Sequence, residues 1–385
     1  MTTFIVSAVR TPIGKFLGGL AEFTAPQLGS FAVREALKRA NLPPEAVDEV
    51  IMGHVVQAGC GQNPARQAAL AAGLPDTINA HTTNMVCGSG LKAVMLADQA
   101  IRCGDASIIV AGGMESMSRA PFLLPNVRGG YKYGDQTAVD ALIRDGLWCP
   151  FEKWPMGNAA EHTASQCGIS RAEQDRFAAQ SHLRAAAAWA SGAFTAEAMP
   201  VQAAKATINR DEGIRPDSTA EGLAKLKPAF KPDGTVTAGN ASQLSDGAAA
   251  VVVASEASVR KYGLKPLAKI LASATSGVAP KDIFLAPVSA IRKLTAALPL
   301  DRVDLFELNE AFASQMLGCA QELKLAEAKV NVNGGAIALG HPIGASGARV
   351  LTTLVHALHA RGLRYGIASL CLGGGNAVAV LVERV

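Results

Sequence analysis

Length, composition and charge exclude several classes of protein. The chain has 385 residues, 49% of them hydrophobic and 18% charged, so it has enough apolar material for two or three folded domains and is not disordered. The formal net charge of +4 is too small to favour nucleic acid as a partner. No run of about 18 apolar residues is available to span a bilayer, so we expect no membrane partner.

Short apolar runs alternate with helical patterns along the chain, which is typical of α/β proteins. The runs that predict strands are residues 3–9, 49–52, 108–111 and 377–382. The patterns that predict helices are residues 32–40, 91–102 and 350–360. The N-terminal run lacks the features of a signal peptide. Seven scattered cysteines without a Cys-x-x-Cys pair argue against a zinc site or a disulfide framework, so we expect a cytoplasmic protein with no bound metal.

The sequence repeats at a nearly constant offset. Leu42–Asp48 resembles Leu298–Asp304, and Cys87-Gly-Ser-Gly90 resembles Gly344-Ala-Ser-Gly347. In both copies of the second motif, a helical pattern, an apolar run and a glycine cluster follow. The repeat predicts two similar α/β halves that pack as a pseudo-dimer around a shared cleft.

The segment from about residue 118 to 241 differs from both halves. It concentrates aromatic residues, prolines and charges, and it contains a charged helical pattern at 171–184. We predict that this segment is an insertion in the first half, which resumes at Gly247–Ala254. An aromatic insertion beside a cleft is a candidate substrate-binding lid.

Cys87 is the candidate nucleophile. It lies in Asn84-Met-Val-Cys-Gly-Ser-Gly90, directly before a predicted helix. Free N–H groups and the helix dipole stabilise a thiolate at such a position, which predicts a pKa below the usual value of about 8.5. The same N–H groups could hold an oxyanion. A structural cysteine at a tight turn is the alternative interpretation.

His341, Cys371 and Asn309 are further candidates. His341 lies in a loop rich in glycine and proline, and the repeat brings this loop to the same end as Cys87, which predicts a Cys–His pair. Cys371 ends an apolar run before three glycines and either faces the cleft or packs in the core. Asn309 follows the apolar run 303–306 and either orients a water or an oxyanion, or caps a helix. No P-loop or Gly-x-Gly-x-x-Gly motif stands between a strand and a helix, which argues against a nucleotide cofactor.

Four blocks of sequence, in order, resemble the signatures of one family. The blocks are residues 84–90, 309–312, 331–347 with its Gly-His-Pro core, and 371–375. Over nearly its whole length the chain is similar to thiolases, and most of all to acetyl-CoA acetyltransferases and acyltransferases. The resemblance implies a five-layered α-β-α-β-α fold of two similar halves with an inserted loop domain that binds CoA. The implied ranges are 1–117 and 242–264 for the N-terminal half, 118–241 for the loop domain, and 265–385 for the C-terminal half.

The resemblance also implies roles for the candidate residues. Cys87 would carry the acyl group, and His341 would be the base that activates it. Cys371 would be the acid and base at the α-carbon of the second substrate. Asn309 would hold a water that, with His341, stabilises the enolate-like oxygen, and the N–H groups of Cys87 and Gly373 would form a second oxyanion hole.

The resemblance implies substrate contacts as well. The residues expected in the CoA and acyl pocket are Met156, Arg215, Ser242 and Phe312. Acetoacetyl-CoA thiolases often carry a histidine before the Met-Gly of the loop domain, where this chain has Pro155. This departure argues against strict specificity for acetoacetyl-CoA.

The implied activity is an acyl transfer through an acyl-cysteine. It is either reversible condensation of two acetyl-CoA to acetoacetyl-CoA and CoA, or CoA-dependent thiolysis of 3-ketoacyl-CoA. CoA compounds are substrates here, so no cofactor is expected, and the family implies a role in fatty acid metabolism and a homo-oligomer, either a dimer or a tetramer. The alternatives are a broader-chain thiolase of β-oxidation, a decarboxylating ketoacyl synthase and a non-catalytic acyl-CoA or lipid carrier. Cys371 argues against the synthase, and the four intact blocks argue against the carrier.

Overall fold

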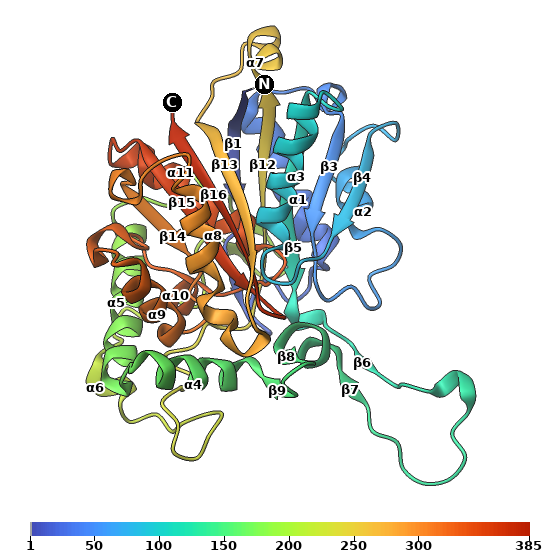
Figure 1. The fold of residues 1–385 in the computed structure, drawn as a ribbon. Coiled ribbons are helices and arrows are strands. Elements are labelled where there is room, and N and C mark those ends of the chain that lie inside the picture. Colours follow the sequence, from blue (N-terminus) through green and yellow to red (C-terminus); the bar gives the residue numbers. More distant parts are fainter. Residues whose placement is uncertain (1) are drawn as a thin grey trace.

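Strands from both halves of the chain join into one 10-stranded mixed sheet in the computed structural model, which describes residues 2–385 (Figure 1). Its strands are β1 (Thr3–Arg10), β2 (Gly14–Lys15), β3 (Glu49–Gly53), β4 (Asn79–Thr83), β5 (Ile108–Ser116), β12 (Ser245–Ser255), β13 (Ala268–Gly277), β14 (Leu305–Leu308), β15 (Tyr365–Leu372) and β16 (Asn376–Arg384). The spatial order is β14-β15-β16-β13-β1-β12-β5-β3-β4, and β2 pairs with β12.

The two halves of the sheet share one topology. The first runs β3-β5-β12-β1 and the second β14-β15-β16-β13. In each, the first two strands are parallel and the later neighbours antiparallel. The halves connect where β1 pairs with β13 over only two residue pairs, Phe4–Lys269 and Ile5–Ala268. The similar halves predicted from the repeat are therefore confirmed, and a short stretch of hydrogen bonding joins them.

Helices cover the half-sheets and also separate them. The helices are α1 (Ala25–Ala40), α2 (Pro64–Ala71), α3 (Ser89–Cys103), α4 (Met156–Cys167), α5 (Arg171–Ala190), α6 (Ala220–Leu223), α7 (Glu256–Tyr262), α8 (Ala286–Leu294), α9 (Ala313–Leu323), α10 (Ala336–Leu339) and α11 (Ser346–Ala360). No helix within residues 2–385 is both long and apolar enough to cross a membrane.

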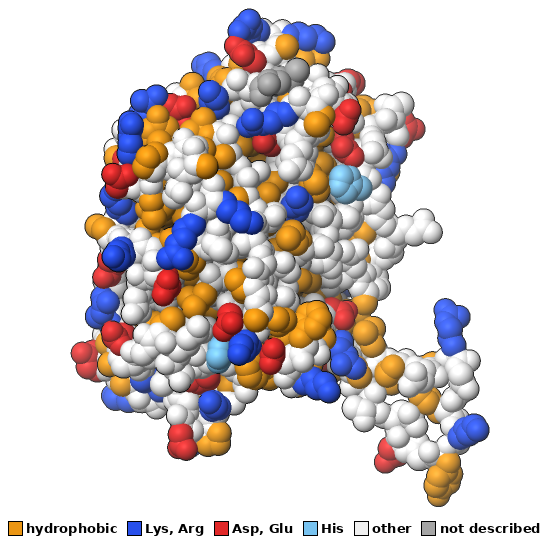
Figure 2. Space-filling model, viewed as in Figure 1, with side chains coloured by type: hydrophobic (Ala, Val, Ile, Leu, Met, Phe, Trp, Pro, Cys, Tyr) orange, Lys and Arg blue, Asp and Glu red, His pale blue; other side chains and the backbone are white. Residues whose placement is uncertain are grey.

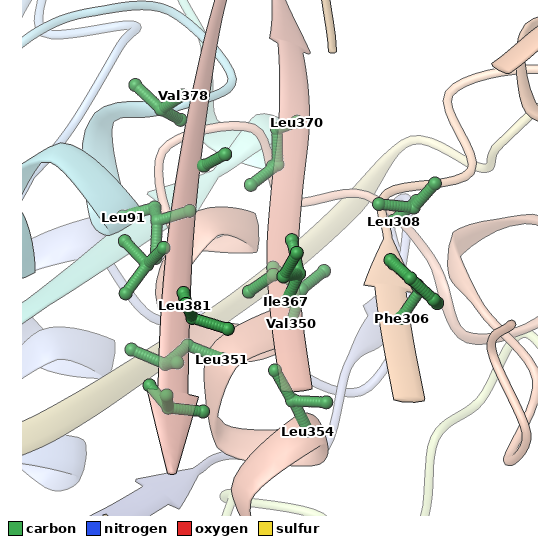
Figure 3. Packing of buried hydrophobic residues seen from close by; sticks show 14 of the residues in the cluster. Leu91, Phe306, Leu308, Val350, Leu351, Leu354, Ile367, Leu370, Val378 and Leu381 are labelled. Atoms are coloured by element: carbon green, nitrogen blue, oxygen red, sulfur yellow. The ribbon is translucent and has the colours of Figure 1, made fainter. Parts of the chain in front are cut away.

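Side chains that alternate between the two faces of a strand explain how the sheet and the helices form layers. Val251 and Val253 of β12 pack in the core that contains α3 and α11, whereas Val252 packs in the core formed with α1 and α2. Successive side chains of a strand point to opposite faces, so β12 contributes to both cores. Helix α8 packs against β13 and β16 of the second half-sheet. The layers run α, β, α, β, α, as predicted. Figure 3 shows part of the inner core, with Leu91 and Val350 among its side chains.

The N-terminal ends of α3 and α11 touch each other at two glycines. A Cβ on Gly347 would lie 2.2 Å from the backbone nitrogen of Leu91, and one on Gly90 would lie 2.8 Å from that of Ala348. Only residues without a side chain allow the two backbones to approach this closely. Both glycines belong to the repeated motif, so the repeat places the helices that follow Cys87 and His341 in direct contact.

The chain between β5 and β12 forms the insertion. These two strands are antiparallel neighbours in the sheet, although more than a hundred residues separate them in sequence. The insertion contains α4, α5 and α6 and three two-stranded ladders, whose strands are β6 (Phe122–Leu123), β7 (Val139–Asp140), β8 (Trp148–Cys149), β9 (Trp154–Pro155), β10 (Val201–Gln202) and β11 (Thr207–Ile208). Beyond β6 and β7 the chain projects from the body as a long arm (Figure 1).

Candidate active site

Three of the four catalytic candidates line one cavity. This cavity has a volume of about 520 Å³, and Cys87, His341, Cys371 and Gly373 are part of its wall. The rest of the wall is mostly apolar and includes Met117, Ile143, Leu147, Met156, Phe230, Leu244, Ile283, Phe284, Phe312 and Ile343. The structure therefore brings together two thiols and an imidazole that are far apart in the sequence.

A strained turn presents Cys87 to the cavity. Val86, the preceding residue, has φ of 49°, a left-handed conformation that β-branched residues rarely adopt. Ser89 holds this turn in place, since its hydroxyl accepts from the Met85 N–H at 2.8 Å and donates to the Val86 carbonyl at 2.6 Å. Helix α3 begins at Ser89, so the sulfur lies just before the helix, as the sequence predicts.

The prediction of a lowered pKa at Cys87 is wrong for the free protein. Burial raises the pKa of the thiol to about 12, because removal from water disfavours the thiolate more than the local N–H groups favour it. The N–H groups of Cys87 itself and of Gly373 act in the opposite direction and lower this pKa. Cys87 is therefore a neutral thiol at rest and needs a base. The two N–H groups that face its sulfur are the pair expected to form an oxyanion hole.

His341 is neutral and held in one orientation. Burial, followed by the Arg349 cation, lowers its pKa to about 3, so the ring is a base rather than an acid at neutral pH. Ser346 lies 2.6 Å from Nδ1 and donates its own proton to the Pro342 carbonyl at 2.9 Å. Because a hydroxyl has one proton, Ser346 must accept a hydrogen bond from Nδ1–H. The lone pair of His341 is then on Nε2.

Glu115 ties the His341 loop to the segment that follows β3. Its buried carboxylate accepts hydrogen bonds from the N–H groups of Gly344 at 2.9 Å, Val55 at 3.1 Å and Val56 at 3.2 Å. His54 lies on the same carboxylate, with its Nε2 3.2 Å from Oε1. A buried carboxylate with several N–H partners fixes the loops that supply those groups.

Asn309 and Cys371 complete the cluster of candidates. Asn309 follows β14, and its amide nitrogen lies 3.4 Å from each ring nitrogen of His341. Cys371 is near the end of β15. Burial, and then the neighbouring Cys87, raises the pKa of the Cys371 thiol well above its usual value. The structure therefore brings all four candidates together.

Three of the four predicted substrate contacts reach the cavity. Met156, Ser242 and Phe312 line it, and so does Pro155. Arg215 does not, since it is exposed, and its N–H donates to His182 Nδ1 at 3.1 Å.

Sequence reasoning missed several residues of the site. Phe230 lines the cavity, and its ring centroid is 6.2 Å from that of Phe312, but no pattern in its loop pointed to this contact. Ser346 and Ser89 were also missed. They occupy matching positions in the two copies of the repeat, so the repeat itself was a signal that could have found both.

Comparisons with known proteins agree along the whole chain. The family model described as thiolase, N-terminal domain, matches residues 3–257, and that described as thiolase, C-terminal domain, matches residues 264–384. An acetyl-CoA acetyltransferase of Chromobacterium violaceum is 52% identical, with 100% of both chains covered. An acetyl-CoA acetyltransferase of Escherichia coli is also 52% identical and covers 99% of this chain and 98% of its own.

Solved structures give the same result. Human mitochondrial 3-ketoacyl-CoA thiolase in complex with CoA superposes with a TM-score of 0.98 at 44% identity, covering 100% of this chain and 98% of its own. The Bacillus anthracis acetyl-CoA acetyltransferase gives a TM-score of 0.97 at 44% identity, covering 100% and 99%. Sequence, fold and family models lead to one conclusion: the chain belongs to the thiolase family and is an acyltransferase.

Proposed function

We propose that this thiolase condenses two acetyl-CoA to acetoacetyl-CoA and CoA, and runs the reverse thiolysis, through an acetyl group carried on Cys87. The observation that carries this proposal is the shared cavity, whose wall includes Cys87, His341, Cys371 and Gly373. A Claisen condensation needs a nucleophile, a base and donors for two oxyanions, and this set of groups can supply them without a cofactor.

The first half-reaction loads the enzyme. His341 Nε2 removes the Cys87 proton as the sulfur attacks the thioester carbonyl carbon of acetyl-CoA. The N–H groups of Cys87 and Gly373 stabilise the oxyanion. The CoA thiolate takes the proton of the neutral Cys371 thiol and leaves, so Cys371 becomes a thiolate and His341 keeps the Cys87 proton on Nε2. The neutral imidazole supports this role, because a ring with a pKa of about 3 has its lone pair free at neutral pH.

The second half-reaction forms the carbon–carbon bond. Cys371 takes a proton from the methyl group of a second acetyl-CoA, and the resulting carbanion attacks the acetyl carbonyl on Cys87. That thioester bond breaks, acetoacetyl-CoA forms, and the Cys87 sulfur leaves and takes back the proton from His341 Nε2. Asn309 and the protonated Nε2 of His341 stabilise the enolate oxygen. Their adjacent nitrogens, 3.4 Å apart, support a shared oxyanion site.

Mass spectrometry tests the acyl carrier. After brief incubation with acetyl-CoA and proteolysis, the acetyl group should be on the peptide that contains Cys87. A label on Cys371, with Cys87 free, would reverse the assigned roles.

A broader-chain thiolase is the second candidate. It is favoured by the apolar wall of the cavity, to which Phe230, Phe284 and Ile143 contribute, and by Pro155, which lines the same space. Thiolysis rates should be measured with acetoacetyl-CoA and with longer 3-ketoacyl-CoAs, using Cys87→Ala as the inactive control. A rate that falls steeply with chain length supports the acetyl enzyme. A thiolysis rate that stays constant or rises with chain length supports the broader-chain thiolase, which we place in fatty acid degradation.

We propose a cytoplasmic homotetramer. Two exposed features support assembly. Strand β4 is an edge strand with one unpaired side, and on the projecting arm Phe122 is 68% exposed and Tyr133 is fully exposed. Figure 2 shows hydrophobic side chains along this arm. Light scattering during gel filtration should give four times the chain mass. Replacing residues 124–138 by a short Gly-Ser linker should reduce the assembly, and a monomeric wild-type protein would refute the proposal.

A further inference from the structure

The side chain of Gln243, which lines the catalytic cavity, connects two distant parts of the backbone. Its Nε2 donates to the carbonyls of Gly213 and Ile337, each at 2.9 Å, and the carbonyl oxygen of Ala338 is 3.3 Å away. Gly213 belongs to the insertion, whereas Ile337 and Ala338 lie in α10, which ends two residues before His341. Because a carbonyl can only accept, these three oxygens fix the amide nitrogen on their side.

The backbone of the same segment holds His341 directly. The carbonyl of Gln243 accepts from the His341 N–H at 3.0 Å. The neighbouring residue, Ser242, donates its N–H to the Ala311 carbonyl at 3.0 Å, two residues after Asn309. This segment therefore lies between the two loops that supply the proposed enolate oxyanion site.

Helix α10 depends on partners outside itself, because it is a single turn of four residues. The last carbonyls of a helix have no partner within it. Ile337 and Ala338 are 1% and 0% exposed, so water does not reach their carbonyls freely, and Gln243 supplies the donor. From the other side, Oε2 of the buried Glu310 accepts from the Ile337 N–H at 3.1 Å.

The Gly213 end of this connection is firmly held. Two residues earlier, Asp211 forms a buried bidentate ion pair with Arg10, with nitrogen–oxygen distances of 2.7 and 3.0 Å. Such pairs fix geometry as well as adding energy. Gly213 also packs so closely on α10 that a Cβ there would lie 2.8 Å from the Ala338 carbonyl oxygen. The insertion is therefore a fixed support against which Gln243 holds α10.

We infer that Gln243 is a positioning residue, which fixes the place of His341 by holding α10 against Gly213 of the insertion. This inference rests on the role proposed above for His341. It gives the insertion a part in catalysis beyond lining the cavity, since the insertion then sets where the imidazole lies. Loss of the link should slow the chemical steps rather than weaken substrate binding, because a displacement of about 1 Å at a reacting group can cost about 100-fold in rate.

Gln243→Met tests the link, because methionine is similar in length but cannot donate. In this variant kcat for thiolysis of acetoacetyl-CoA should fall about 10- to 100-fold with KM little changed. Amide hydrogen exchange, followed by mass spectrometry, should become at least about tenfold faster in residues 336–341, because α10 loses its donor. Gln67→Met is the matched control. Gln67 Nε2 also donates to two carbonyls, those of Cys60 at 2.8 Å and Gln62 at 2.9 Å, but Gln67 is not part of the cavity wall, so kcat and this exchange should stay unchanged.

Gly213→Ala tests the same link from the insertion. The new Cβ would lie 2.8 Å from both the Ala338 carbonyl oxygen and Gln243 Oε1, so it should push the insertion and α10 apart and lower kcat. If both substitutions act through one link, the double variant should be no slower than the slower single variant. Independent effects would multiply instead.

Three results would overturn the inference. The first is a folded Gln243→Met protein with the kcat of the wild type, and should that variant not fold, Gly213→Ala gives the same comparison. The second is a raised KM with unchanged kcat, which would make Gln243 a substrate contact. The third is multiplication of the two effects. Failure of the proposed function is distinguishable, because His341→Asn would then turn over like the wild type, while exchange in residues 336–341 would still report on the link.

Discussion

Removal of the Ser346 hydroxyl tests how the site sets the tautomer of His341. In Ser346→Ala, the buried Nδ1–H loses the acceptor that lies 2.6 Å away. An unsatisfied buried donor costs about 1–3 kcal/mol, and this cost falls on the tautomer that leaves Nε2 free to act as a base. Since each 1.36 kcal/mol changes a rate tenfold, kcat for thiolysis of acetoacetyl-CoA should fall by about 5- to 150-fold.

A matched control separates this effect from a general loss of packing. Ser314→Ala also removes a fully buried hydroxyl, one that donates to the Ala160 carbonyl at 3.0 Å and does not touch His341. Both variants should lose thermal stability, but only Ser346→Ala should lose kcat, with KM little changed. Equal kcat values in the two folded variants would show that Ser346 does not set the tautomer.

Three further predictions follow from the same geometry. His341→Asn should lower turnover by at least about 100-fold, measured as steady-state thiolysis, because a general base is removed; residual activity near wild type would exclude His341 as that base. Cys371→Ala should still accept an acetyl group on Cys87 but should not exchange the methyl hydrogens of acetyl-CoA with deuterated water, and rapid exchange would point to another base. Gly347→Ala should destabilise the protein by about 1–3 kcal/mol or more in urea unfolding, because its Cβ would lie 2.2 Å from the Leu91 backbone nitrogen; an unchanged midpoint would mean that the helices separate easily.

The two similar halves of the fold and the reactive side chains of the candidate active site could be predicted from the sequence. The repeated Gly-Ser-Gly and Ala-Ser-Gly motifs located α3 and α11, and the strand predicted at 108–111 is the first part of β5. Helix α1 begins at Ala25, seven residues before the predicted pattern, because Pro26 in its first turn and the capping box between Thr24 and Gln27 were not used as start signals.

The electrostatics of the site could not be predicted from the sequence. A helix N-terminus does favour the Cys87 thiolate, but how strongly burial opposes it depends on what packs over the sulfur, and those groups come from distant segments. The apolar residues that line the cavity could not be predicted from the sequence for the same reason. Phe230 and Phe284 join Phe312 in space through long-range contacts that no local pattern encodes.

Because of the contact between Gly90 and Gly347, changes to the reactive groups and changes to the substrate-binding wall have different consequences. The reactive groups are attached to the ends of two helices that touch backbone to backbone, so even small insertions there would disturb the nucleophile and the base together. Met156 and Phe230, by contrast, reach the cavity from the insertion, outside that contact. Mutations in the insertion can therefore alter which acyl chains are accepted while the reaction itself is inherited unchanged. A fold built in this way can diversify its substrates without having to reinvent its catalysis.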